Sequence, residues 1–306
     1  MGLPDNKINH NFSTEYKTLQ LHRSTNLITI YENHRMSLKQ YQHDPTQRFS
    51  NRVENYIRYR PGYPDEVLQI LEKETGLTPS SIIADVGSGT GISAKLFLKN
   101  GNTVYAVEPN DAMRKAAESL LKNYPNFHSI NGTSSATAID DHCIDLVAAA
   151  QAFHWFTPGE ARREFDRILK PDGNVVLMWN RRKENETLFL ASYEALLQQY
   201  GTDYAQVRHT NINDHVLGAF FESYKKHVVY NEQLFDFDGL KGRLLSSSYA
   251  PAKGHPNYEP MIEQLKIMFE EYQQNGQVRF EYDTEIYTGQ VSSEHGIILN
   301  FELSII

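Results

Sequence analysis

The pattern of apolar and polar positions divides the chain into alternating strands and helices from residue 64 onward. Short, nearly continuous apolar runs, which are typical of strands buried on both faces, alternate with segments whose apolar residues recur at helical intervals. We predict strands at 82–86, 103–107, 144–150 and 174–179, and helices at 65–74, 92–99, 111–123 and 158–169. Strands and helices that alternate at this spacing predict a parallel sheet with helices on both faces.

This rhythm changes after residue 183. Apolar residues recur at helical intervals over 184–221, a stretch too long for a simple connection, so we interpret 184–223 as a helical cap insertion. The later pattern predicts a strand at 225–237, helices at 239–246 and 258–274, and a final antiparallel strand at 279–287.

The predicted domain organisation has four parts. Residues 1–44 are polar and without sustained periodicity, so we expect a mobile or surface-lying extension. Residues 45–183 form the core of the sheet, 184–223 form the cap, and 224–306 complete the sheet beside the cap.

Composition narrows the class of protein. The 306 residues are 40% hydrophobic, enough for a sizeable core, and no apolar run approaches the ~18 residues of a membrane helix. The single cysteine, Cys143, cannot form an internal disulfide, which favours a reducing, cytoplasmic setting. A net charge of −8 argues against broad binding to nucleic acid. Composition leaves the oligomeric state open.

The strand at 82–86 runs into a glycine-rich turn. Asp85 is followed by Gly87, Gly89 and Gly91, and glycine lets a ligand contact the backbone where such sheets bind ligands. No Lys-Ser or Lys-Thr follows, as a phosphate-binding loop would require, and Ile92 stands where the dinucleotide fingerprint needs glycine. Taken alone, the spacing also suits an ordinary strand–turn–helix.

The next strand ends in Glu108, about 20 residues after the glycines. A carboxylate there can accept hydrogen bonds from both hydroxyls of a ribose, although a solvated glutamate is the alternative. Together, the glycine turn and this acid predict a nucleoside ligand, and the missing anion fingerprint predicts that it carries no diphosphate.

Five segments resemble, in the correct order, the class I S-adenosylmethionine-dependent methyltransferases, specifically the small-molecule group that includes trans-aconitate methyltransferase. ADVGSGTG (84–91) and VYAVEPNDAM (104–113) are similar to the glycine and acidic motifs. The others are RFSNRVENYIRYRPGYP (48–64), AAAQAFHWFTP (148–158) and LKPDGNVVLMWN (169–180). The resemblance covers roughly 46–250. It implies a doubly wound, Rossmann-like seven-stranded α/β sheet with an antiparallel final strand, and methyl transfer to a small organic acceptor.

The resemblance also implies which residues contact the cofactor. These are Tyr59, Arg60, Asp85, Gly87, Gly89, Gly91, Glu108, Pro109, Met113, Ser134, Ser135, Ala136, Gln151 and Ala152. Asp85 and the glycines would shape the methionine pocket, Glu108 would hold the ribose, and Pro109 and Met113 would lie against the adenine. Gln151 and Ala152 would pass beside the sulfonium. Tyr59 and Arg60 would close over the cofactor.

One position departs from the family pattern. The family commonly has an acidic residue where Ser135 stands, and a serine hydroxyl accepts a hydrogen bond from the adenine amino group without charge. Ser134 or the backbone of Ala136 could compensate for the missing charge.

His154 and Trp155 are the candidate residues for the acceptor side. His154 is the candidate base because imidazole titrates near neutrality, and its alternative is a local hydrogen-bonding role. Trp155 is expected either as a wall of the acceptor site or as core. Arg181 could bind an acidic acceptor or lie on the surface, and a few tyrosines between 193 and 258 could line the pocket.

The histidines show no metal-ligand spacing, so no metal is expected. Two other functions stay open: a non-catalytic module that binds the same cofactor, and a nicotinamide-dependent oxidoreductase.

Overall fold

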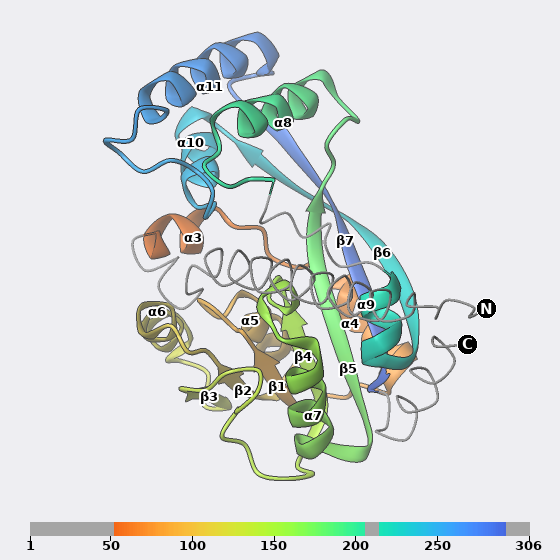
Figure 1. Cartoon of the computed structure of the whole chain (residues 1–306). Helices are drawn as coiled ribbons and strands as arrows, with labels where there is room; N and C mark the ends of the chain where they lie inside the picture. The colour runs from red at the N-terminus through yellow and green to blue at the C-terminus, as the bar shows by residue number, and fades with distance from the viewer. Residues whose placement is uncertain (1–51, 206–213, 292–306) are drawn as a thin grey trace, which may run out of the picture. The chain divides into compact units, whose positions relative to one another are not determined.

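The computed structural model describes residues 52–205 and 214–291, so the predicted extension at 1–44 lies outside the described residues (Figure 1). One seven-stranded sheet has the order β3-β2-β1-β4-β5-β7-β6. Its strands are β1 (Ile82–Val86), β2 (Thr103–Val107), β3 (Phe127–Ile130), β4 (Ile144–Ala150), β5 (Leu169–Arg182), β6 (Phe221–Phe235) and β7 (Val278–Val291). Neighbouring strands are parallel except where β7 runs antiparallel to β5 and β6. The prediction of seven strands with an antiparallel final strand is confirmed.

Helices cover both faces of this sheet, because successive residues of each strand point to opposite sides. They are α3 (Val53–Tyr59), α4 (Glu66–Thr75), α5 (Ile92–Lys99), α6 (Asp111–Leu121), the 3₁₀ turn η1 (Phe153–Trp155), α7 (Pro158–Ile168), α8 (Leu188–Tyr200), α9 (Asp214–Phe220), α10 (Phe237–Leu245) and α11 (Tyr258–Tyr272). In β1, Ile83 packs with α4 and α5, whereas Ala84 and Val86 pack on the face covered by α7 and α9.

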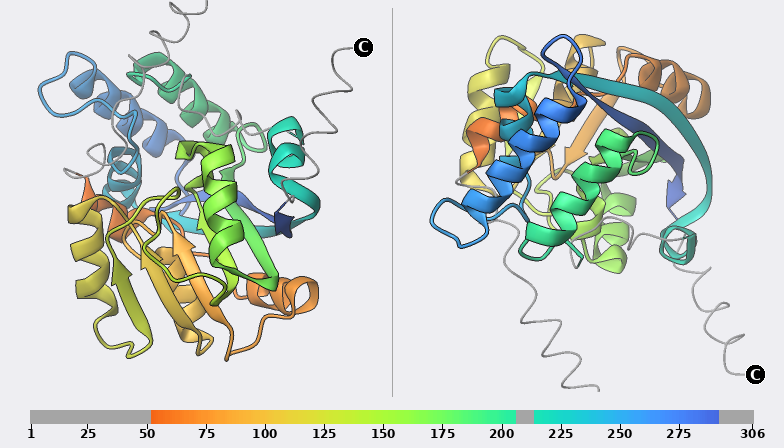
Figure 2. Two further views of the ribbon diagram at one scale, coloured as in Figure 1. Left: turned by 60° about the horizontal axis from the view of Figure 1, so that its bottom comes forward. Right: turned by 90° about the horizontal axis from the view of Figure 1, so that it is seen from above.

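A second hydrophobic core lies at the C-terminal end of β6 and the N-terminal end of β7. We define this second core by its strand residues Phe235, Val278, Phe280 and Tyr282. Helices α8, α10 and α11 pack on it, and α8 and α11 lie side by side (Figure 2). The helix expected over 184–221 is therefore two helices with different neighbours: α8 belongs to the second core, whereas α9 packs against α7.

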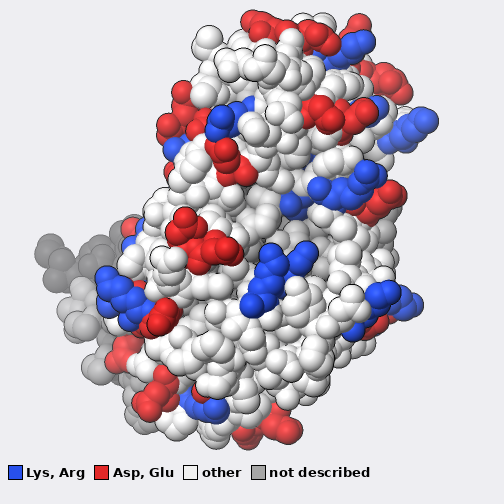
Figure 3. Space-filling model, turned by 180° about the vertical axis from the view of Figure 1, so that it is seen from behind, with Lys and Arg blue, Asp and Glu red and all other residues white. Residues whose placement is uncertain are grey.

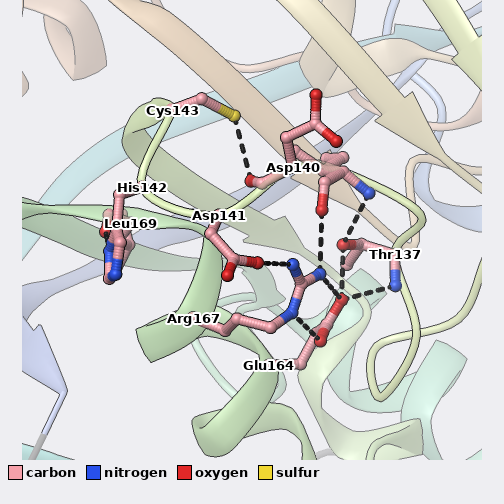
Figure 4. Close-up of polar contacts among 9 residues, drawn as sticks. Thr137, Asp140, Asp141, His142, Cys143, Glu164, Arg167 and Leu169 are labelled. Carbon is pink, nitrogen blue, oxygen red and sulfur yellow. Dashed lines mark hydrogen bonds and ion pairs between the residues drawn. The ribbon is translucent and has the colours of Figure 1, made fainter.

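A polar network fastens the loop before β4 to α7 (Figure 4). Glu164 accepts hydrogen bonds from the backbone N–H of Thr137 (2.7 Å) and from its hydroxyl (2.6 Å). Arg167 donates to both carboxylate oxygens of Glu164 and also pairs with Asp141. The thiol of Cys143 donates to the carbonyl of Asp140 in the same loop. The path from residue 137 to 143 is thus fixed by side chains of one helix.

Replacing Glu164 by glutamine is expected to lower the free energy of unfolding by roughly 1–3 kcal/mol at pH 7. Burial alone would raise the pKa of Glu164, but hydrogen bonds from Arg167 and Thr137 outweigh it and lower the pKa to about 2. The charged form therefore stabilises the fold above pH ~4.5, and this contribution is lost as the pH falls toward 2. Urea unfolding at several pH values measures the difference.

The exposed Glu160 on the same helix provides the control for this prediction. Glu160→Gln should leave both the stability and its pH dependence unchanged. A Glu164→Gln variant whose stability deficit is the same at pH 3 as at pH 7 would contradict the role given to the charge.

Candidate functional site

The candidate site lies where the strand order reverses, between β1 and β4. Asp85 near the end of β1 pairs with Ala148 of β4, so the loops that follow the two strands leave the sheet side by side. In parallel α/β sheets this reversal leaves a crevice outside the carboxyl ends of the strands, which is where ligands bind.

The three glycines of the loop after β1 differ in the space beside their backbone. Gly87, Gly89 and Gly91 all have positive φ, at 71°, 56° and 82°. A Cβ at Gly87 would lie 2.6 Å from the Cβ of Ala152, and one at Gly91 would lie 2.6 Å from Leu121 Cδ1, whereas one at Gly89 would meet nothing within 4 Å. Close packing therefore explains glycine at 87 and 91, and the bare backbone faces open space at Gly89.

Glu108, the residue that follows β2, contacts that loop through its side chain. Its carboxylate accepts hydrogen bonds from the N–H of Gly89 (2.9 Å) and the N–H of Asn110 (2.8 Å). Burial raises the pKa of Glu108, although both N–H groups favour the ionised form. Each carboxylate oxygen retains a lone pair that could accept a hydroxyl of a ribose.

Asp85 is completely buried and only half satisfied. The hydroxyl of Ser93 donates to Oδ2 at 2.7 Å, but Oδ1 has no hydrogen-bond partner among the described residues. Burial raises the pKa of Asp85 to about 7, against the hydrogen bond from Ser93. A buried carboxylate oxygen without a partner is rare in native proteins and suits a cationic or hydrogen-donating ligand.

Tyr63, in the segment before α4, lies near the same carboxylate. The sequence did not predict this residue as part of the site. Burial raises the pKa of Tyr63 well above its ordinary value, and the neighbouring Tyr56 and Asp85 add to this effect. Nothing in the local pattern distinguishes Tyr63 from the other aromatic residues of the segment, so only the tertiary structure identifies it.

Tyr59 and Arg60 face the end of α10. The ring of Tyr59 packs so closely on Gly242 that a Cβ there would lie 2.0 Å from the ring. The guanidinium of Arg60 donates to the carbonyl of Ser246 (2.9 Å) and lies 5.0 Å from the centre of the Tyr56 ring. In the sequence-based interpretation both residues close over the cofactor, and this stays a prediction; in the structure one face of Tyr59 packs on α10.

The loop after β4 carries an unusual backbone. Gln151 has φ 56°, and its N–H donates to the carbonyl of Met178 at 2.8 Å. Ala152 is buried against Gly87, and η1 then places the partly buried rings of His154 and Trp155 4.8 Å apart. A positive φ outside glycine costs energy and often marks a functional turn.

Asn180 links this loop to other segments. Its carbonyl accepts from Gln151 Nε2 (3.4 Å), its Nδ2 donates to the carbonyl of Gly62 (3.1 Å), and its Oδ1 accepts from Thr284 (2.6 Å). The segment 60–64, the β4 loop and the long strands β5 and β7 are thereby held together.

The remaining predicted contacts lie around the first turn of α6 and in a tight turn after β3. Met113 is buried, Pro109 is partly buried, and the side chain of Asn110 caps α6 by accepting from the N–H of Met113 (3.0 Å). Ser134 and Ser135 form the tip of a turn closed by hydrogen bonds between Thr133 and Ala136. Both backbone groups of Ala136 take part in this turn, because its N–H donates to the carbonyl of Thr133 (3.2 Å) and its carbonyl accepts from the N–H of Thr133 (3.0 Å).

The described residues hold no group of three or more side chains that could bind a metal. Among the described helices, none combines the length and apolar content that crossing a bilayer requires.

Comparisons with known proteins agree with this geometry. Residues 84–177 match a family described as "Methyltransferase domain". The chain is 31% identical over 152 residues to an uncharacterised methyltransferase of Schizosaccharomyces pombe, covering 49% of this chain and 59% of that protein. It is 33% identical over 141 residues to an uncharacterised methyltransferase of Mycobacterium tuberculosis, covering 46% and 55%. The chain thus spans less than two thirds of the length of these relatives.

A solved structure from Anaeromyxobacter dehalogenans, provisionally assigned as a type II methyltransferase, has a similar fold. Its TM-score is 0.57 at 18% identity, and the match covers 76% of this chain and 98% of that one.

Proposed function

We propose that the chain is a class I S-adenosylmethionine-dependent methyltransferase that transfers a methyl group from that cofactor to a small organic acceptor. One observation carries the proposal: the carboxylate of Glu108 accepts a hydrogen bond from the N–H of Gly89, the loop glycine at which a Cβ would meet no described atom within 4 Å. An acid held there fits a ribose, and the unpartnered Oδ1 of Asp85 fits an ammonium group.

When bound, the cofactor supplies a methyl group already activated by its positively charged sulfur. The residues of this chain then have to orient the cofactor and the acceptor and to enclose both. Glu108 would hold the ribose, Asp85 the amino group, and the strained turn at Gln151 would lie beside the reacting centre. Good alignment alone can supply about 7–11 kcal/mol for an in-line displacement. His154 would accept a proton if the acceptor is an amine, a phenol or a carbon acid.

A small acceptor suits the charge distribution better than a nucleic acid. The net charge is −8, and on the face shown in Figure 3 the basic and acidic side chains are interspersed. Nucleic-acid binding favours a continuous basic surface. A cytoplasmic location remains part of the proposal, resting on the single cysteine.

Calorimetric titration with S-adenosylhomocysteine, with NADH as the control ligand, tests the function. Binding of S-adenosylhomocysteine alone is the expected result. Binding of NADH alone would favour the oxidoreductase. Cofactor binding without methylation of any member of a broad acceptor panel would favour the non-catalytic module.

The pH dependence of this binding provides a further prediction. Because burial holds the pKa of Asp85 near 7, about nine tenths of this carboxyl is protonated at pH 6. A bound ammonium favours the ionised form, so affinity for S-adenosylhomocysteine should rise up to about tenfold between pH 6 and 8, with proton release. The ligand-free protein should lose stability as the pH rises from about 4 to about 7, because the unfolded chain has then released this proton and the folded state still holds it, and the loss should level off above pH 7.

Titrations in two buffers of different ionisation enthalpy measure the released proton. Asp85→Asn should remove both the proton release and most of the pH dependence. A wild-type affinity that is flat from pH 6 to 8 would contradict the contact between Asp85 and the amino group.

A further inference from the structure

Three arginines lie where α3, α10 and the second core meet: the side chains of Arg243 and Arg182 are largely buried, and Arg60 is partly buried. Arg243 is 7% exposed, and its guanidinium lies over the rings of Phe280 (5.5 Å) and Tyr282 (5.9 Å). The side chain of Arg182, at the end of β5, is 9% exposed and lies 5.2 Å from the centre of the Tyr193 ring. Arg60 reaches the same region, because its Nη2 and the Nη1 of Arg243 both contact the hydroxyl of Ser247.

The cluster contains more positive than negative charge. Within residues 52–205 and 214–291, Arg182 pairs with the carboxylate of Glu194, but the hydrogen bonds of Arg60 and Arg243 go to neutral groups. Those of Arg243 go to the hydroxyls of Tyr282 (3.1 Å) and Ser247 (3.2 Å). Buried arginines are almost always paired with an anion, since removing an uncompensated charge from water is costly.

Several donors in the cluster also have no acceptor. Arg182 Nη1, Arg60 Nε and the hydroxyl of Tyr193 are buried and have no hydrogen-bond partner in the described part of the chain. Aromatic rings stabilise the cations by cation–π contact, but a ring face does not replace a missing acceptor. Apart from Glu194, which pairs with Arg182, the described part of the cluster offers these donors no negatively charged acceptor.

The cluster adjoins the candidate cofactor site. Arg60 lies over the ring of Tyr56, and Tyr63 interacts electrostatically with Tyr56, Arg60 and Asp85. A ligand held by the arginines would therefore be separated from the unpartnered oxygen of Asp85 by one short segment of chain. Arg181, the arginine that the sequence suggested for an acidic acceptor, is half exposed and faces Glu285 at 3.5 Å.

We propose that Arg60, Arg182, Arg243 and Tyr193 bind the anionic group of a small organic acid, and that this acid is the methyl acceptor. The planar guanidinium fork is suited to a carboxylate or a phosphate, and Tyr193 supplies one further neutral donor. This assignment of acceptor class rests on the methyltransferase function proposed above, whereas the anion site itself does not.

The experiment uses the full chain, with and without saturating S-adenosylhomocysteine, titrated with succinate, inorganic phosphate and the neutral analogue succinamide. Succinate or phosphate should bind and succinamide should not, and the better anion identifies the group recognised. Arg243→Met should weaken that binding at least about tenfold, and Tyr193→Phe about fivefold. Arg167→Met, which removes the arginine of the α7 network, is the control and should leave anion binding unchanged.

Stability measurements separate a binding role from a structural one. Arg243→Met removes a charge without an acidic partner, so it should unfold at an equal or higher temperature than the wild type while losing anion binding. If that variant fails to fold, Tyr193→Phe decides, because the Tyr193 hydroxyl makes no hydrogen bond with the described residues. Equal binding of succinate, phosphate and succinamide, or no binding of any, would overturn the site, as would unchanged affinity in Tyr193→Phe and Arg243→Met.

The two proposals fail in different ways. Absence of S-adenosylhomocysteine binding would refute the function, and the titration without it would still decide the anion site. Normal S-adenosylhomocysteine binding together with no anion binding would refute the anion site alone.

Discussion

Replacing Glu108 by alanine is expected to weaken binding of S-adenosylhomocysteine by about 10- to 100-fold. The substitution removes two charge-assisted hydrogen bonds to the ribose, worth roughly 1.5–3 kcal/mol. It also frees the N–H of Gly89, which the carboxylate now holds at 2.9 Å, so part of the loss comes from a looser glycine loop. Isothermal titration at one pH measures the change directly.

Two further variants separate these contributions. Glu108→Gln keeps an acceptor near Gly89 but removes the charge, so its affinity should lie between those of the wild type and Glu108→Ala. Glu118→Ala removes an exposed glutamate from α6 and should bind normally. Wild-type affinity in a folded Glu108→Ala protein would show that the ribose lies elsewhere.

The second large effect is expected from alanine at Gly87, compared with alanine at Gly89. Both positions have positive φ, so both substitutions carry backbone strain of roughly 1–2 kcal/mol. Only at Gly87 would the new Cβ meet protein, 2.6 Å from the Cβ of Ala152, which adds overpacking of roughly 1–3 kcal/mol. Gly87→Ala should therefore be the more destabilised variant in urea unfolding.

The order of the two variants should be reversed for ligand affinity: relative to the stability that each loses, Gly89→Ala should lose more affinity for S-adenosylhomocysteine than Gly87→Ala. A Cβ at Gly89 projects into the open side of the loop, so Gly89→Ala should fold well and bind S-adenosylhomocysteine poorly. Normal affinity in Gly89→Ala would show that the cofactor avoids that side. Equal destabilisation of the two variants would contradict the contact between the β1 and β4 loops.

The core strands could be predicted because burial on both faces leaves a local signature. The bounds predicted for β1, β2 and β4 are those of the structure. Strand β3 has only four residues, FHSI, of which the middle two are exposed, so no apolar run reveals it. Strand β5 was predicted too short, since it pairs with β4 on both sides of an irregularity in register between Leu169 and Asn174.

The two halves of the candidate site also differed in how far the sequence alone could predict them. Asp85, the glycines and Glu108 follow apolar runs, and parallel strands bring their ends together, so the sequence alone could place them. Arg60 and Arg243 meet at the hydroxyl of Ser247 only because α10 packs against α3, which no local pattern encodes. On β5 the sequence offered Arg181, with a surface position as its alternative, and a shift of one residue to Arg182 moves the side chain to the opposite face of the strand.

The unequal lengths of the strands bear on how this fold can diversify. β1 and β2 have five residues each and end at the proposed cofactor, whereas β6 and β7 have 15 and 14 and continue into the second core. If the proposals hold, substitutions at those ends of β6 and β7 would alter which acceptor binds without disturbing the backbone that contacts the nucleoside. Gene duplicates of such a protein would then keep the methyl donor and acquire new acceptors by exchanging residues at the ends of these two strands and in the helices that pack on them.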